Sequence, residues 1–355
     1  MNIWEQFLSW FGAPRISSEK IKDISENSPE IIMWAAPIMF FFVALEWYIS
    51  YRQERHLYEK KETIGSIFVG VGNVIIAFLM KIALLSLIVL VYNLVPWRMY
   101  FSWWMLIPCY IIFDFFSYWA HRTSHQQRFW WATHVVHHSG ENYNLTVSFR
   151  LSWVQHLKII FFMPVAFLGF HPVIFFIVNQ IAVLFQFWVH TEYIRKMPRI
   201  IEYIFATPSN HRVHHGSQEK YINKNYGATF IIWDRMFGTF QEEDEKVIYG
   251  VTHNIENKLN PLIINFHEFR DIWNDIRSTT SWKMRFFYLF GDPIAISQEK
   301  KSKVVYASVQ ENPEDSQGQT PADNSRQSSH GANRPMTIVE KAKAGVLETR
   351  QVVRK

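Results

Sequence analysis

The chain has 355 residues, of which 49% are hydrophobic and 17% aromatic, and its formal net charge is +5. Its single cysteine, Cys109, excludes an intrachain disulfide framework and a thiolate metal cluster, so any metal site has to be built from His, Asp or Glu. Lys and Arg are scattered rather than gathered in blocks, which argues against nucleic-acid binding and favours contact with an anionic membrane surface.

The first apolar segment follows a polar N-terminal stretch, residues 1–30, in which we find no removable signal peptide. Residues 31–50 contain one charged side chain, Glu46, and at about 1.5 Å rise per residue they are long enough to span a bilayer. A basic loop at residues 51–62 comes next. The positive-inside rule predicts that this loop faces the cytoplasm.

Three more apolar segments follow the basic loop. Residues 64–95 are expected to form one long, tilted span, with Lys81 snorkelling or facing the helix bundle, and residues 101–120 to form the next crossing. Residues 157–189 are broken at 169–172 and each half is short for a full crossing, which predicts a tilted or re-entrant hairpin. On this count the segments before and after the hairpin share the cytoplasmic face. If residues 64–95 crossed the membrane twice, the count would no longer place these segments on the cytoplasmic face.

The C-terminal part of the chain is more polar. From residue 297 onward Ser, Gln, Asn, Gly and charged residues dominate, so we expect a disordered tail over 297–355, with a short basic helix over 335–355 as its one candidate element. The sequence therefore predicts an all-α integral membrane protein with about four to five transmembrane or re-entrant helices. Its membrane domain would cover residues 31–290 and carry a cytosolic helical cap.

Twelve of the fifteen histidines lie between residues 121 and 253, and eight of these form one HxxxH and two HxxHH motifs. Positions three and four apart share one face of an α-helix, so each motif can direct two or three imidazoles to a common point. The eight residues are His121, His125, His134, His137, His138, His211, His214 and His215.

Neutral imidazole suits Fe, Zn, Cu and Ni, whereas Mg and Ca require oxygen ligands. Eight clustered nitrogens exceed the three protein ligands of a catalytic zinc site, so their number predicts two metal ions. A pH switch built from histidines would explain neither the repeated spacing nor the adjoining apolar segments. Five other histidines are expected to be structural or exposed: His56, His156, His171, His267 and His330.

Further site candidates lie near these motifs. His190 ends the apolar hairpin and is expected to be a ninth ligand, while for His253 the sequence leaves a ligand and a structural role open. Asp114 lies two helical turns before His121, and we expect its carboxylate to accept a hydrogen bond from a ligand imidazole, the alternative being an ion pair with Lys or Arg. The same supporting role is open to Glu141 and Asp234.

Two metal ions at the cytoplasmic end of an aromatic-rich helical bundle suit oxidation of an acyl or terpenoid chain. With iron, such a centre can activate O₂ and attack an unactivated C–H bond, and zinc can replace iron in preparations. A desaturase would use the same oxidant. A non-catalytic metal-binding transporter or sensor is a further alternative, although transport would require ionisable residues deep in several spans.

The ordered motifs resemble a known superfamily. HRTSH, HVVHH, FQFWVH and HRVHH, preceded by DFFSYWAHR, are similar to the membrane-bound fatty acid hydroxylase and sterol desaturase superfamily. HHSGENYNLTVSFR, TPSNHRVHHGSQEKYINKNYGATFIIWDRMFGTF and YGVTH resemble its alkylglycerol monooxygenase-like branch, and the similarity covers roughly residues 30–290. Where we expect a Glu in that branch, directly after HRTSH, this chain has Gln126, and the segment after residue 297 is outside the family pattern.

The resemblance implies a helical membrane protein with a cytosolic cap, two iron ions held by nine histidines (the eight above and His190), O₂ as oxidant and a lipid substrate. In the alkylglycerol branch, hydroxylation of the ether-bonded carbon gives a hemiacetal that breaks to an aldehyde and glycerol. The reductant would be tetrahydrobiopterin or an electron-transfer protein. The membrane would be the inner membrane in a bacterium or the endoplasmic reticulum in a eukaryote. Candidate catalytic residues beside the metals are Asp114, Asn144, Asn225 and Tyr226, and turn structure would explain the last three about as well.

Overall fold

The computed structural model describes residues 8–251 and 254–311. Within this part every regular element is a helix, and the extended segments form only the isolated bridges Phe11–Met99 and Phe205–Phe230. The predicted all-helical class is confirmed for these residues. Contacts divide the chain into a first unit, residues 1–300, and a second unit, residues 301–355. The first unit holds every element discussed below except the C-terminal part of the last helix.

Two long helical segments are apolar enough to cross a membrane. One covers Ser18–Arg52 and consists of α2 (Ser18–Asn27) and α3 (Ile31–Arg52), and the other is α4 (Lys60–Leu94). The prediction of a single uninterrupted helix over 64–95 is confirmed. Large apolar side chains are exposed on both: Trp34 of α3 is 82% exposed and Phe78 of α4 is 77% exposed. Such exposure is costly in water and favourable in lipid.

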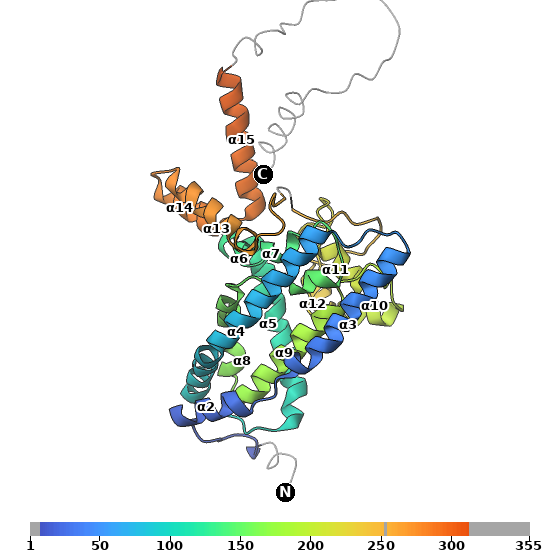
Figure 1. Cartoon of the computed structure of the whole chain (residues 1–355). Helices are drawn as coiled ribbons and strands as arrows, with labels where there is room; N and C mark the ends of the chain where they lie inside the picture. The colour runs from blue at the N-terminus through green and yellow to red at the C-terminus, as the bar shows by residue number, and fades with distance from the viewer. Residues whose placement is uncertain (1–7, 252–253, 312–355) are drawn as a thin grey trace, which may run out of the picture. The chain divides into compact units, whose positions relative to one another are not determined.

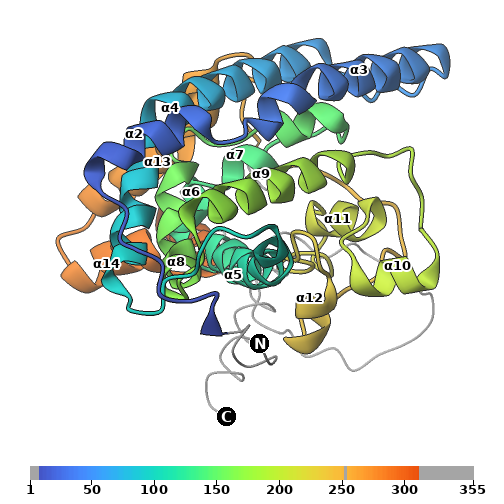
Figure 2. The same ribbon diagram turned by 90° about the horizontal axis from the view of Figure 1, so that it is seen from below.

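The third apolar segment forms α5 (Leu106–Gln126), which follows a short 3₁₀ turn, η1 (Trp103–Met105). Two candidate spans were found among the described residues, and α5 is neither of them, because it combines an apolar N-terminal part with Asp114 and the polar sequence at its C-terminal end. Figure 2 looks nearly along α5, which lies in the middle of the first unit with α8 and α9 beside it.

The predicted hairpin over 157–189 is present as short helical pieces with a break. The pieces are η3 (Gln155–Phe162), α8 (Met163–Phe167) and α9 (Pro172–Trp188). The break contains Gly169, whose φ is +89° and where an added Cβ would lie 2.5 Å from the carbonyl oxygen of Trp97. Only glycine fits such a position, which explains why the apolar sequence turns here.

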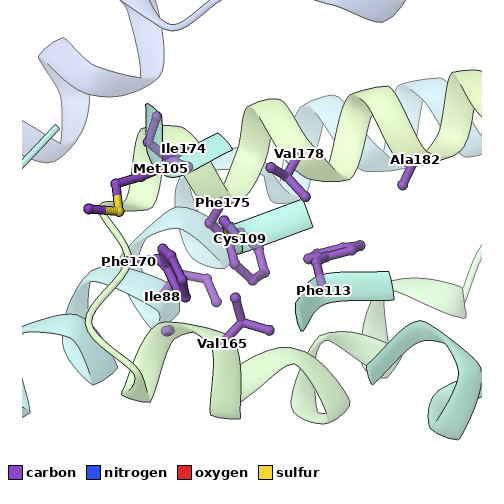
Figure 3. Packing of buried hydrophobic residues seen from close by; sticks show 11 residues of the cluster. Ile88, Met105, Cys109, Phe113, Val165, Phe170, Ile174, Phe175, Val178 and Ala182 are labelled. Carbon is purple, nitrogen blue, oxygen red and sulfur yellow. The ribbon is translucent and has the colours of Figure 1, made fainter. Parts of the chain in front are cut away.

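The main hydrophobic core joins α5 to this hairpin. Figure 3 shows Cys109 and Phe113 of α5 among residues of α8 and α9, and the ring centroids of Phe113 and Phe175 are 5.4 Å apart. Cys109 is fully buried, as expected for a small apolar side chain in a hydrophobic segment. This packing fixes the direction of α5 and therefore the position of the histidines at its C-terminal end.

Short helices surround the C-terminal part of α5, as Figures 1 and 2 show. They are α6 (Arg128–Ala132), α7 (Val135–His138), η2 (Leu145–Phe149), α10 (Arg199–Ile204), α11 (Pro208–His214) and α12 (Ile232–Met236). Two longer helices follow, α13 (Pro261–Arg277) and α14 (Trp282–Phe290), and pack against each other.

The expected start of disorder at residue 297 is wrong as far as Glu311, because α15 (Pro293–Glu311) continues through it. Proline in the first turn and two hydrogen bonds to the Asp292 carboxylate, from the backbone N–H groups of residues 294 and 295, start this helix. The remainder of the predicted tail lies outside the described residues, as do the candidate helix over 335–355, His253 and His330.

Candidate metal centre

The structure brings all nine predicted histidine ligands together and sorts them into two groups. Within each group the candidate ligand nitrogens lie within 4.8 Å of one another. The five-histidine group consists of His121, His125, His134, His138 and His214, and the four-histidine group of His137, His190, His211 and His215.

Each HxxHH motif divides its histidines between the groups in the same way, whereas both histidines of HRTSH belong to the five-histidine group. The first and last histidines of HVVHH, His134 and His138, belong to the five-histidine group, and the middle one, His137, belongs to the other. In HRVHH the first and last, His211 and His215, belong to the four-histidine group. Residues at i and i+4 on a helix project in nearly the same direction, whereas a residue at i+3 points to the other side of that line. One HxxHH turn can therefore contribute to two metal sites at once.

The Nε2 atoms of the four-histidine group form a closed ring. His190 Nε2 lies 3.1 Å from that of His137 and 3.0 Å from that of His211, and His215 Nε2 lies 3.2 Å from each of the same two atoms. Imidazole nitrogens at about 2.1 Å from one metal ion would be about 3.0 Å apart at right angles and about 3.4 Å apart at tetrahedral angles. These spacings fit four ligands of one ion.

The five-histidine group has similar spacings. His134 Nε2 lies 2.8 Å from that of His121 and 3.2 Å from that of His138, which is 3.0 Å from His214 Nε2. His125 Nε2 is buried and has no hydrogen-bond partner among the described residues. A buried polar nitrogen without a partner is costly, and a metal ion in the group would supply one.

Backbone carbonyls fix the tautomer of three of these rings. The Nδ1–H of His121 donates to Tyr226 O at 2.7 Å, that of His190 to Gln186 O at 2.6 Å, and that of His214 to Lys224 O at 3.0 Å. Because a carbonyl oxygen only accepts, these neutral rings carry the proton on Nδ1 and present a lone pair at Nε2. Several Nε2 lone pairs thus converge with about 3 Å between the nitrogen atoms. A metal ion requires such a set of ligand atoms.

The imidazoles are held neutral by their surroundings. Burial lowers the pKa of His190 to about 3 and that of His214 to about 4. Burial, followed by the charges of neighbouring imidazoles, holds the pKa of the other ligand candidates outside α5 well below the usual value; these are His134, His137, His138, His211 and His215. The charge of Lys158 also lowers the pKa of His134 and His137. Neutral imidazole is the form that binds metals, so the residues present fit two metal ions.

The segment 224–226 aims carbonyl oxygens at two ligands of the five-histidine group. Its central residue, Asn225, has a φ of +56° and is nearly fully buried. The Asn225 amide donates to Asn210 O and Gln241 O and accepts from Gln241 N–H at 2.8 Å. Backbone groups thus satisfy this side chain, and Asn225 shapes the turn that orients His121 and His214. Of the two roles that the sequence left open for Asn225, a residue beside the centre or a turn former, its hydrogen bonds favour the turn former.

Asp234 supports the same turn from behind. Its carboxylate accepts hydrogen bonds from the backbone N–H groups of Tyr226 and Gly227, each at 2.7 Å, and from the Thr239 hydroxyl at 2.6 Å. The supporting role expected for Asp234 therefore acts through the peptide whose carbonyl receives the His121 proton. The other candidate, Glu141, instead forms a 2.8 Å ion pair with Lys258.

The predicted hydrogen bond between Asp114 and a ligand imidazole is wrong. The Asp114 carboxylate is fully buried and accepts from Thr229 N–H at 2.9 Å, Phe230 N–H at 3.1 Å and the Trp233 indole N–H at 2.9 Å. Two helical turns place it on the face of His121 but about 10 Å along the helix axis, where the segment before α12 crosses α5. Asp114 therefore connects α5 to the segment that carries Tyr226 and Asp234.

We expect Asp114→Ala to lower the free energy of unfolding by about 3–5 kcal/mol, because three buried donors lose their acceptor. Asp114→Asn keeps one carbonyl oxygen and should lose less. The measurement is chemical denaturation in detergent of both variants beside the wild type. An Asp114→Ala variant as stable as the wild type would contradict this role.

Two of the catalytic candidates, Asn144 and Tyr226, have very different surroundings. Asn144 starts η2, where its Oδ1 accepts from Thr146 and its amide donates to Leu57 O at 2.6 Å, so turn structure accounts for it. Tyr226 has a buried hydroxyl without a partner among the described residues. Its ring centroid lies 5.8 Å from that of His121 and 5.3 Å from that of His125. Tyr226 is the candidate whose polar atom is free to meet a ligand of the centre.

Sequence reasoning missed several residues that hold the histidines. Arg150 is buried and donates to Val136 O at 3.0 Å and to the Ser139 hydroxyl at 2.6 Å, which fixes the middle of the HVVHH turn and the residue that follows it. Glu46 accepts from the Thr191 hydroxyl and from Leu145 N–H, and so joins α3 to the residue after His190. Charged side chains inside apolar surroundings were the available signal for such supports.

The substitution at Gln126 lies away from both groups. This residue is the last of α5, and its side chain is exposed, whereas the preceding His125 is buried. The four expected structural histidines among the described residues, His56, His156, His171 and His267, also stay outside the two groups. His171 accepts a hydrogen bond at the start of α9, and His267 is bonded to Ile264 O at 3.0 Å.

Comparisons with known proteins agree with this site. A family model described as fatty acid hydroxylase matches residues 106–239. The chain is 36% identical over 274 residues to alkylglycerol monooxygenase of Xenopus tropicalis and 36% identical over 279 residues to that of Homo sapiens. Each alignment covers 76% of this chain and 60% of the relative, so the chain spans well under two thirds of their length.

A bacterial relative is more distant. The chain is 30% identical over 133 residues to an ornithine lipid hydroxylase, OlsE, of Rhizobium tropici, an alignment that covers 37% of the chain and 40% of the relative. No solved structure shows a significant match to the chain. The family match includes every histidine of both groups. Over residues 106–239 the chain is therefore similar to fatty acid hydroxylases, and over 76% of its length it is similar to alkylglycerol monooxygenases.

Proposed function

We propose that this protein is a membrane-bound di-iron monooxygenase that hydroxylates a C–H bond of a lipid with O₂. The observation that carries the proposal is the pair of adjacent, all-imidazole groups, one of five and one of four histidines, whose Nε2 atoms converge at 2.8–3.2 Å. Two ions in these groups would supply the activation of O₂. One oxygen atom enters the lipid, and the other leaves as water after the uptake of two electrons and two protons.

The named relatives indicate the substrate class. Two of them are alkylglycerol monooxygenases and one is an ornithine lipid hydroxylase, so each acts on a lipid by name. We infer that this chain hydroxylates the ether-bonded carbon of an alkylglycerol, which yields a hemiacetal that separates into an aldehyde and glycerol. The two electrons come from an external reductant, either tetrahydrobiopterin or an electron-transfer protein.

The protein groups around the centre would do three things in this reaction. The carbonyls of Lys224, Tyr226 and Gln186 hold three ligand rings in the metal-binding tautomer. Buried side chains exclude water from the imidazoles. The Tyr226 hydroxyl can donate a hydrogen bond or a proton to a group bound beside the five-histidine group.

We place the centre at the cytoplasmic face of a membrane, the inner membrane in a bacterium or the endoplasmic reticulum in a eukaryote. The candidate spans α3 and α4 are joined by a loop that contains Arg55 and is flanked by Arg52 at the end of α3 and Lys60 at the start of α4. Arg55 lies over the ring of Tyr193, three residues after His190, at 4.7 Å. The basic loop and the histidines thus share one end of the spans. The positive-inside rule supports the cytoplasm as that side.

The test is lipid mass spectrometry of cells that express the wild type, His138→Ala or His267→Ala and are supplied with ¹⁸O₂. Only the wild type and the His267→Ala control should produce a labelled lipid product. For an ether lipid, immediate borohydride reduction converts the labelled aldehyde to an alcohol before the oxygen exchanges with water. A product that has lost two hydrogens without label would indicate a desaturase. No change in any lipid class would contradict an oxygenase.

A further inference from the structure

The helices α13 and α14 lie side by side at the edge of the first unit (Figures 1 and 2). Both expose large apolar side chains. On α14, Trp282, Phe286 and Phe290 follow one another at intervals of four residues and so form one stripe along the helix. Trp282 is 79% exposed and Phe286 is 67% exposed. Tyr288, on the opposite side of this helix, is buried against the rest of the protein.

The outer face of α13 continues this apolar surface. Leu262, Phe266 and Trp273 are spaced for one side of the helix and are exposed, and Trp273 is 60% exposed. Ile264 and Ile272, which lie on other sides of α13, are buried. Exposed aromatic side chains in this number are expensive in water, because each carries a large apolar area that water must solvate.

Basic side chains border the two stripes, whereas two of the three acidic side chains of α13 are turned inward and the third, Asp271, is partly exposed beside Arg270 at 3.4 Å. Arg277 and Lys283 are exposed beside Trp273 and Trp282. In contrast, Glu268 and Asp275 form 2.6 Å ion pairs with the buried Arg128 of α6. The outer surface therefore combines aromatic and cationic groups, which is the composition of helices that lie in the headgroup region of anionic membranes.

The position of α13 relative to a candidate span matches such a role. An added Cβ at Gly65 of α4 would lie 3.1 Å from Ile264 Cδ1, and Ile264 also packs against Val69. Phe68 and Val71 of α4 are close in sequence to these contact residues, and their side chains are exposed. Where α4 begins to present an apolar surface to its surroundings, α13 therefore stands beside it.

We propose that α13 and α14 form an interfacial anchor that lies in the surface of a bilayer containing anionic lipids. The aromatic stripes enter the headgroup and upper acyl region, and Arg277 and Lys283 contact lipid phosphates. The anchor is distinct from the oxygenase chemistry and from the crossings by α3 and α4. It would hold the histidine-bearing end of the protein at a fixed height, since α13 also packs against α6 and α7.

The test uses fluorescent labels on single cysteines. Cys109, which is buried, is replaced by Ala, and a bimane label is placed at Trp282→Cys, at Trp34→Cys on the candidate span α3, or at Glu219→Cys on the exposed surface near the metal centre. The full chain is reconstituted in mixed phosphatidylcholine–phosphatidylglycerol vesicles containing a phosphatidylcholine with a nitroxide near the top of its acyl chain. Phe286→Cys repeats the measurement at a second position of α14.

We expect the nitroxide lipid to quench the labels at residues 282, 286 and 34 and to leave the label at 219 unquenched. Adding Arg277→Glu and Lys283→Glu, or removing phosphatidylglycerol, should weaken quenching at 282 and leave residue 34 unchanged. Quenching at 34 without quenching at 282 and 286 would overturn the anchor and leave the membrane assignment intact. Protection of 282 from aqueous iodide without lipid quenching would indicate a protein partner, such as a second copy, and would also overturn it.

Discussion

His138→Ala is expected to abolish lipid turnover, with a loss of more than about 100-fold, while the amount of protein in the membrane stays the same. Removing only an outer-shell partner of a metal ligand typically costs about 10–100-fold, and His138 is proposed as a ligand itself. It also stands at the junction of the two groups, because its ring stacks on that of His215 with centroids 4.4 Å apart and an interplanar angle of 24°. Its loss would disturb both sites.

The two groups should respond differently in metal content. His138→Ala leaves four imidazoles in the five-histidine group, enough to hold an ion, whereas His211→Ala leaves three in the other group. We therefore expect a larger loss of iron, measured by elemental analysis of the purified protein, for His211→Ala than for His138→Ala. The matched control is His267→Ala, which lies outside both groups and should keep metal and turnover.

Full turnover by His138→Ala would contradict the assignment of this residue as a ligand. Equal and complete loss of both ions in His138→Ala and His211→Ala would contradict the division into two separable groups. Membrane levels and thermal stability are measured on the same preparations. These measurements distinguish a general folding defect from a specific loss of a metal ligand.

The histidines could be predicted as a set, but their division into two sites could not. Motif spacing places His134, His137 and His138 on one helical turn, which is compatible with a single shared point. The actual turn is the four-residue α7 with His134 just before it, and positions i+3 and i+4 differ by about 100° around a helix, which sends His137 to the other group. That difference matters only when partner rings arrive from α5 and α11, and sequence alone does not position those helices.

The sequence indicated which buried charged residues need a hydrogen-bond partner, but it did not indicate which partner each one has. Asp114 was recognised as a carboxylate that needs a partner in apolar surroundings, and it has one, although the partner is the backbone around residue 229 rather than an imidazole. The nearest partner of a buried carboxylate depends on which loop crosses the helix at that height. Helix locations for 31–50 and 64–95 followed directly from local composition, because a long apolar run has few other stable forms.

Tyr226→Phe is expected to lower turnover by about 100-fold or more while leaving metal content unchanged and stability equal or slightly higher. The substitution removes one hydroxyl, which is buried beside His121 and His125 and has no hydrogen-bond partner in the described part of the chain. An unpaired buried hydroxyl costs folding free energy, so its removal should not destabilise the protein. A loss of activity without a loss of stability therefore indicates a hydroxyl that acts on bound substrate or oxygen.

The matched control is Tyr118→Phe, because the Tyr118 ring lies 6.1 Å from that of Tyr226 and its hydroxyl is also buried. This hydroxyl is bonded to Thr239 Oγ1 at 3.0 Å and to Arg122 at 3.2 Å, so its removal should cost about 1 kcal/mol of stability. Turnover of Tyr118→Phe should remain within a few-fold of the wild type. If Tyr226→Phe keeps its turnover, the Tyr226 hydroxyl has no part in the reaction. If Tyr118→Phe loses as much turnover as Tyr226→Phe, the effect is not specific to the Tyr226 hydroxyl.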